Sequence, residues 1–69
     1  MQKVREAARR HSAQMADVAL AAGASIARLA PAMAALRHGD ALHAAGNDGE
    51  AVGQYAMGFG LAANTAVFS

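Results

Sequence analysis

A glycine followed at once by an asparagine, Gly46-Asn47, constrains this chain most, because the pair predicts where one helix ends and another begins. Glycine readily adopts the positive φ that ends a helix, and Asn47 can accept hydrogen bonds from the first N–H groups of the next helix. Glu50, three residues later, can complete a capping box. The sequence therefore predicts two antiparallel helices, over residues 31–45 and 48–62, joined by a tight turn.

Both predicted helices carry apolar residues at helical spacing. In the later helix, with Gly58 between them, these residues are Ala51, Val52, Tyr55, Phe59 and Leu61. In the earlier helix, Leu36 and Leu42 are the larger apolar residues, and Gly39 is expected where the two helices come closest.

A long helix is predicted before this hairpin, over residues 3–29. Apolar and small residues recur there in steps of four and three, which is typical of a helix that packs along another helix. These residues are Val4, Ala8, His11, Met15, Val18, Ala22, Ser25 and Leu29. Gly23 is the weak point, because glycine costs about 1 kcal/mol relative to alanine inside a helix, and two shorter helices are the alternative. Pro31 is expected to end this helix and to open the next one.

The chain is short and poor in large core residues. It has 69 residues, with two Phe, one Tyr and no Trp, and a chain of this size buries only about 60% of the surface that it exposes when unfolded. It has no cysteine, which excludes disulfides and thiolate metal sites. We therefore expect one all-α domain over 1–69, a long N-terminal helix packed on the antiparallel hairpin, that is stabilised by association with protein. A homo-oligomer, most simply a two-fold symmetric dimer, is the expected form, and an obligate complex with a different chain is the alternative.

Partner-binding residues are expected in two places. Val67 and Phe68 follow the last predicted helix with little chain left to cover them, so they could dock on another subunit, or the chain could be a piece of a longer protein. The other candidates lie along the first helix and are Val4, His11, Met15, Val18, Ala22 and Leu29.

Four of the six basic residues lie in the first ten positions, and they are Lys3, Arg5, Arg9 and Arg10. The net charge is only +1 and no aromatic residue accompanies these four, so we expect neither a nucleic-acid-binding nor a membrane-bound protein. A small nucleic-acid or membrane-surface binder that uses these basic turns is the alternative function. Gln14 and Asp17 interrupt the apolar stretch that a secretory signal would need, and we expect a cytoplasmic protein.

Catalytic and metal-binding patterns are not recognisable in this sequence. His38 and His43 are five residues apart, whereas two helical metal ligands normally differ by four, and His11 is distant in sequence. No serine or threonine is adjacent to a base in a recognisable nucleophile motif. We therefore expect a protein that is not an enzyme, with no metal and no cofactor.

The hairpin region, roughly residues 32–65, resembles a single tetratricopeptide repeat, a helix-turn-helix unit of about 34 residues. The matching residues are Gly39, Ala41 and Leu42 in its first helix, Gly46 in its turn, and Ala51, Tyr55 and Leu61 in its second helix. Three positions depart from the family, because Ala35 stands where Trp is frequent, Gly58 where Ala is frequent and Ala63 where Pro is common. The resemblance implies a scaffold, adaptor or chaperone-like protein that docks a partner segment in a helical groove. A generic helical hairpin with the same local geometry is the alternative.

Overall fold

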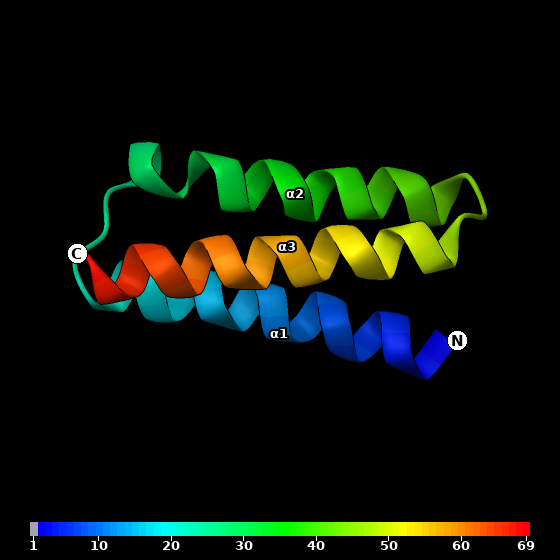
Figure 1. The fold of residues 1–69 in the computed structure, drawn as a ribbon, viewed down its shortest axis with the longest axis horizontal. Coiled ribbons are helices and arrows are strands. Elements are labelled where there is room, and N and C mark those ends of the chain that lie inside the picture. The colour runs from blue at the N-terminus through cyan, green and yellow to red at the C-terminus, as the bar shows by residue number, and fades with distance from the viewer. Residues whose placement is uncertain (1) are drawn as a thin grey trace.

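The third helix organises the fold, because it packs against both of the others. The computed structural model describes residues 2–69, which form α1 (Gln2–Ala21), α2 (Ile26–Ala44) and α3 (Asp48–Val67). The helices lie side by side along the length of a molecule that measures 35 × 19 × 13 Å (Figure 1). Residues 2–69 contain no strand, so the predicted all-α fold, with a first helix packed on a helical hairpin, is confirmed.

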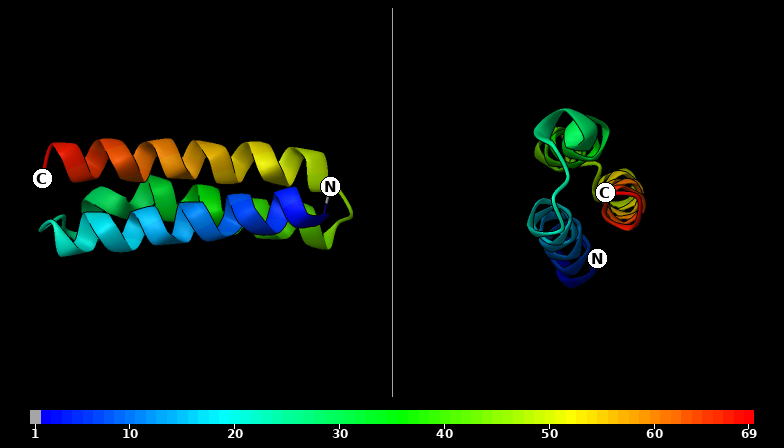
Figure 2. Two further views of the ribbon diagram at one scale, coloured as in Figure 1. Left: turned by 90° about the horizontal axis from the view of Figure 1, so that it is seen from below. Right: turned by 90° about the vertical axis from the view of Figure 1, so that its left-hand side faces the viewer.

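The three helices are not equally close to one another. α3 has extensive contacts with α1 and with α2, whereas α1 and α2 contact each other least. Seen end-on, α3 stands to one side of the other two helices (Figure 2, right). One face of α3 therefore packs inward, and the opposite face points away from the rest of the molecule.

The predicted end of the first helix at residue 29 is wrong. α1 ends at Ala21, and Gly23 has a φ of 100°, a left-handed conformation that glycine adopts readily. Ser25 then caps α2, because its Oγ accepts a hydrogen bond from the N–H of Arg28 at 3.2 Å. The alternative of two shorter helices is therefore correct, and the chain turns at the glycine.

Pro31 lies inside α2, so the prediction that it separates two helices is also wrong. Proline lacks an N–H group, and at this position α2 forgoes the hydrogen bond to the carbonyl of Ala27. The helix tolerates this loss, because Ser25 has already fixed its first turn and because Leu29 and Ala32 on both sides of the proline are buried in the core.

The turn between α2 and α3 follows the prediction in its backbone but not in its side chains. Gly46 has a φ of 84°, and α3 begins at Asp48 as expected. Asn47 occupies the N-cap position, but its side chain makes no capping hydrogen bond, so the predicted capping by Asn47, on which the capping box with Glu50 depends, is wrong. α3 continues to Val67, beyond the predicted end at residue 62.

The core consists of two clusters with different chemistry. The cluster near the α2–α3 turn contains the only tyrosine of the chain, Tyr55, together with Leu36 and Ala51. Gly39 lies against the ring of Tyr55 with no room for a side chain, which confirms the predicted point of closest approach. The cluster at the other end is mostly alanine and contains Ala16, Ala19, Ala24, Leu29, Ala32 and Ala62.

The inner face of α3 is narrower than the apolar pattern predicts. The buried residues of α3 are Ala51, Tyr55, Gly58 and Ala62. Phe59 and Leu61, which the pattern places on the packing face, are 43% and 36% exposed. They lie to either side of the inner face, because one residue is a rotation of about 100° in a helix.

Candidate interaction surface

One polar cluster links all three helices, and its residues Arg9, Asp40 and Tyr55 are here called the polar junction. Arg9 of α1 donates from Nε to Asp40 Oδ1 at 2.8 Å and from Nη2 to Asp40 Oδ2 at 3.1 Å. The hydroxyl of Tyr55, on α3, donates to the same Oδ1 at 2.5 Å. A two-point contact between guanidinium and carboxylate is among the stronger hydrogen-bonded pairs in proteins. The junction therefore fixes α1 and α3 to one carboxylate of α2.

The protonation states of the junction suit a structural contact. Hydrogen bonds from Arg9, helped by the one from Tyr55, lower the pKa of Asp40 below its ordinary value of 3.8. Burial raises the pKa of Tyr55 above 10.0, and the hydrogen bond to Asp40 raises it further. At neutral pH Asp40 is ionised and Tyr55 is protonated, so neither group is poised to exchange a proton.

A second polar group lies next to the α2–α3 turn. Asp48 Oδ1 is 2.7 Å from Nδ1 of His43, and this hydrogen bond lowers the pKa of Asp48 below 3.8. Nε of Arg5 lies 3.6 Å from Asp48 Oδ2, close enough for an ion pair but too long for a hydrogen bond. The buried Nε of Arg5 has no hydrogen-bond partner. These contacts hold the start of α1 on the start of α3.

These contacts correct the predicted basic surface of Lys3, Arg5, Arg9 and Arg10. Arg5 is buried, so its assignment to the surface is wrong. Arg9 is exposed but committed to Asp40. Lys3 and Arg10 are exposed.

The predicted partner-binding residues of the first helix fall into three groups. Val4, His11, Val18 and Ala22 are exposed along one edge of α1 or just after it. Met15 is half-buried and packs against the alanine-rich cluster. Leu29 is 2% exposed and belongs to the core, so its assignment to a partner surface is wrong. The break at Gly23 explains this, because it turns Leu29 into the interior instead of continuing the line.

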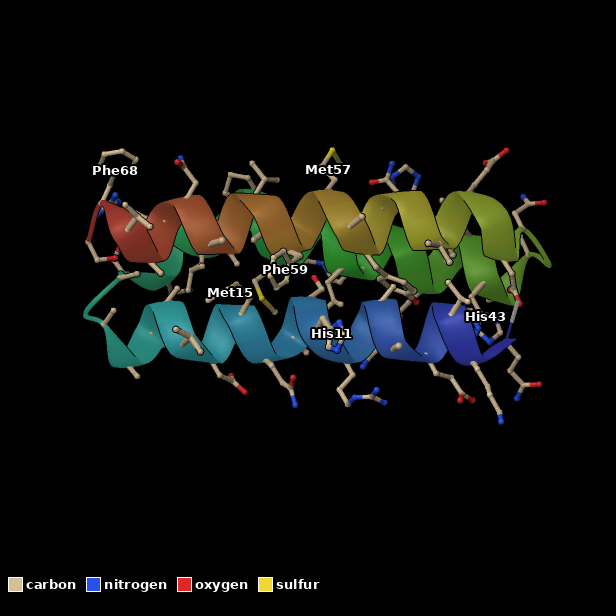
Figure 3. The ribbon with its side chains drawn as sticks, turned by 60° about the horizontal axis from the view of Figure 1, so that its bottom comes forward. His11, Met15, His43, Met57, Phe59 and Phe68 are labelled. Atoms are coloured by element: carbon tan, nitrogen blue, oxygen red, sulfur yellow. The ribbon has the colours of Figure 1, made fainter. Side chains whose placement is uncertain are left out.

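The exposed edge of α1 lies beside α3 rather than apart from it. His11, Met15 and Phe59 come together between α1 and α3 on one side of the molecule (Figure 3). A shallow open pocket of about 240 Å³ is found there, lined by Ala8 and His11 from α1 and by Ala56 and Phe59 from α3. Of the predicted partner-binding residues on α1, His11 therefore lines a pocket whose other wall is α3.

The densest exposed apolar surface is on α3, where the sequence pattern did not place it. Among residues 2–69, nine large apolar side chains are exposed, and five of these belong to α3 and its C-cap residue. They are Met57, Phe59, Leu61, Val67 and Phe68. Val67 and Phe68, which the sequence does single out, are 75% and 70% exposed. A helix surrounded by apolar residues gives no clear periodicity, so Met57 was not singled out, and Phe59 and Leu61 were assigned to the packing face.

The three histidines do not form a common site. His11 and His38 are exposed, and His43 is hydrogen-bonded to Asp48. Within residues 2–69, no three histidine or acidic side chains gather in a way that could hold a metal ion. None of α1, α2 and α3 is both long enough and apolar enough to cross a membrane.

No protein-family model, curated protein or solved structure matches the chain.

Proposed function

We propose that this protein is a non-enzymatic protein–protein interaction module of the cytoplasm, which acts through self-association or by docking a helix of a partner protein. The observation that carries the proposal is the set of five exposed large apolar side chains on α3 and its C-cap residue. Large exposed apolar surface is one of the features that mark a protein-binding surface. Burial of such surface stabilises a complex by about 25 cal/mol per Å².

The resemblance of the hairpin to a tetratricopeptide repeat supports a scaffold, adaptor or chaperone-like role. Of the residues that carry it, Gly39, Ala51 and Tyr55 are buried, whereas Ala41 and Leu61 are exposed. A single repeat cannot bury both faces of its helices, so repeats are normally stacked on neighbours. α1 covers one edge of this hairpin, and the outer face of α3 has no cover among residues 2–69.

Other functions receive no comparable support from the arrangement of side chains. The polar junction consists of groups whose pKa values move away from neutrality, which is the opposite of what acid–base catalysis requires. A nucleic-acid or membrane-surface binder would need the N-terminal basic residues, and Arg5 and Arg9 are already paired within the fold.

The proposal is tested by sedimentation velocity of the full chain over a wide concentration range, with capture of partners on the immobilised protein as a second arm. The double variant Met57→Ser/Phe59→Ser should lose association while its circular dichroism stays helical. The matched control is Leu20→Ser/Ile26→Ser, which removes exposed apolar side chains from α1 and α2 and should associate as the parent does. A parent chain that is monomeric at every concentration and retains no partner protein would contradict the proposal.

A further inference from the structure

The outward face of α3 carries small residues and one valine in alternating steps of four and three. These residues, called the outer line, are Gly49, Gly53, Ala56, Gly60, Ala63 and Val67. All are exposed except Ala63, which is half-buried. Such a line has the spacing of a helix face that packs along another helix. The outer line lies opposite the buried residues Ala51, Tyr55, Gly58 and Ala62, and within residues 2–69 no helix packs along it.

The glycines of the outer line have no role in packing the monomer. A Cβ at Gly49, Gly53 or Gly60 would meet nothing within 4 Å. Glycine destabilises a helix relative to alanine. Alanine at all three positions would therefore make the monomer more stable. Small residues allow two helix backbones to approach closely, which is the use that remains for them.

Large apolar side chains border the outer line on both sides. Phe59 lies toward α1 and borders the pocket between the two helices. Met57, on the opposite side of α3 from Phe59, points away from α1 (Figure 3). By helical rotation, Leu61 lies on the same side as Met57, and both are exposed. A helix seated on the outer line would therefore touch small residues in the middle and large apolar residues at both edges.

The charges of α3 limit which kind of partner can pack on its outer line. Residues 51–69 contain no charged side chain, so this face offers nothing to an acidic or basic partner. A second copy of the same face is complementary to it, because two uncharged apolar surfaces meet without repulsion or unpaired charge. Asp48 and Glu50 are the only acidic residues of α3, and both lie in its first turn.

We propose that α3 pairs with α3 of a second copy in antiparallel orientation, across a two-fold axis at the level of Gly58. This deepens the proposed function, because it rests on self-association and names the occupant and its register. In this register Gly53 lies opposite Ala63 of the second copy, and Ala56 lies opposite Gly60. Val67, the one large residue of the outer line, falls opposite Gly49, where there is most room.

The antiparallel register also suits the acidic first turns of α3 and the large apolar residues that border the outer line. It keeps the two acidic first turns at opposite ends of the pair, and the dipoles of the two antiparallel helices attract each other. Near the axis, Phe59 of each copy reaches the pocket of the other beside His11. That pocket of about 240 Å³ can hold an aromatic ring, since a cavity of about 150 Å³ accepts benzene. At the other edge Met57 of one copy lies near Leu61 of the second.

The surface needed is available. A stable interface buries about 800 Å² on each partner, which is about a fifth of the 4044 Å² exposed by this chain. α3 stands to one side of α1 and α2 (Figure 2, right), and five of the six outer-line residues are exposed.

The first test is Gly60→Leu, measured by sedimentation velocity and circular dichroism of the full chain. The new side chain points into open space in the monomer, so the fold should persist and become more helical. In the dimer, the leucine side chain would hold the two α3 helices apart. The dimer dissociation constant should therefore rise about tenfold to a hundredfold. Ala34→Leu, at an exposed position of α2, is the matched control and should leave the dimer unchanged.

The second test uses the absence of cysteine from the chain, and compares Gly53→Cys, Ala63→Cys and a mixture of the two under oxidation. In the antiparallel register the mixture should form a disulfide-linked dimer. Each variant alone should not, because its two copies would be separated by ten helical residues, about 15 Å, and a disulfide needs Cα atoms within about 7 Å. Cross-linking of Gly53→Cys with itself would overturn the antiparallel register in favour of a parallel one.

The outcomes separate this inference from the proposed function. A parent dimer that Gly60→Leu leaves intact overturns the pairing through α3 but keeps self-association. A monomeric parent that binds a different protein through Met57 and Phe59 overturns the second copy as occupant and keeps the interaction module. Loss of dimer in Gly60→Leu together with cross-linking of the mixture alone supports the pairing.

Discussion

Gly58 and Gly60 are two residues apart in α3 but lie on opposite faces of it. A Cβ at Gly58 would lie 2.8 Å from Ser12 Oγ and 3.2 Å from the carbonyl oxygen of Ala32, whereas a Cβ at Gly60 would meet nothing. The inner glycine is therefore required by contacts within the chain, and the outer one is not. The inner face of α3 is thus filled by contacts within the chain, whereas a partner can still pack on the outer face.

The largest contrast is expected between Ala51→Glu and Ala56→Glu. Ala51 is fully buried, so a glutamate there is overpacked and carries an unpaired charge, which should cost several kcal/mol, about as much as a small domain has. Ala56 is exposed, and the same change there should leave the monomer fold within about 0.5 kcal/mol of the parent. Thermal melts by circular dichroism measure both. Equal melts for the two variants would break the distinction between the faces.

Substituting alanine for Gly58 or Gly60 adds a single methyl group and tests the same difference between the two faces of α3. Gly58→Ala should destabilise the chain by about 1–3 kcal/mol, because Ser12 and the backbone of Ala32 must move. Gly60→Ala should stabilise the monomer by about 0.5–1 kcal/mol through helix propensity alone. Denaturant midpoints should therefore shift in opposite directions, and a shift of the same sign for both variants would contradict the assigned faces.

Tyr55→Phe tests the polar edge of the inner face. The change keeps the buried ring and removes the hydroxyl that donates to Asp40, so it should cost about 1.5 kcal/mol, the usual value for a hydrogen bond to a charged group. Phe59→Leu is the control on the outer side and should change the stability of the monomer less, since Phe59 is 43% exposed. A double-mutant cycle of Tyr55→Phe with Asp40→Ala isolates the contact, and a coupling near zero would contradict its contribution to stability.

The smallest effect is expected from pH, and it should arise from the inner side and the turn alone, because the outer line carries no titratable side chain. Asp40 and Asp48 have lowered pKa values, so their contribution is present above pH 3.8 and is lost as the pH falls below it. Tyr55 has a raised pKa, so its contribution is present below pH 10.0 and is lost as the pH rises beyond it. Denaturant midpoints should therefore fall at both extremes of pH. In Tyr55→Phe the alkaline fall should diminish, and an unchanged profile would argue against the assignment.

Much of the fold follows from local signals in the sequence. The hairpin, the start of α3, the positive φ of Gly46 and the close approach at Gly39 were predicted because each depends on residues near one another in the chain. The break at Gly23 was only an alternative, because a glycine within a helical pattern does not reveal whether the chain will turn there. Pro31 was misplaced for a related reason, since the cap that starts α2 six residues earlier is a serine within a predicted helix.

The surface was less predictable than the fold. Arg5 belongs to a basic cluster in the sequence, and only the position of Asp48 in space explains its burial. Gly53, Gly58 and Gly60 are alike in sequence, and the helices packed on α3 decide which of them is covered. Asn47 fits the capping pattern, yet its side chain makes no capping bond, while the neighbouring Asp48 pairs with His43.

The position of Tyr55 has a practical consequence for optical spectroscopy. The chain has no tryptophan and no second tyrosine, so its ultraviolet fluorescence comes from the one site at which all three helices meet. That ring is fully shielded from water. Separation of α1 from the hairpin, even with every helix intact, would expose the phenol to solvent and to external quenchers. The unmodified protein thus carries its own optical reporter of tertiary opening, distinct from the helical signal of circular dichroism.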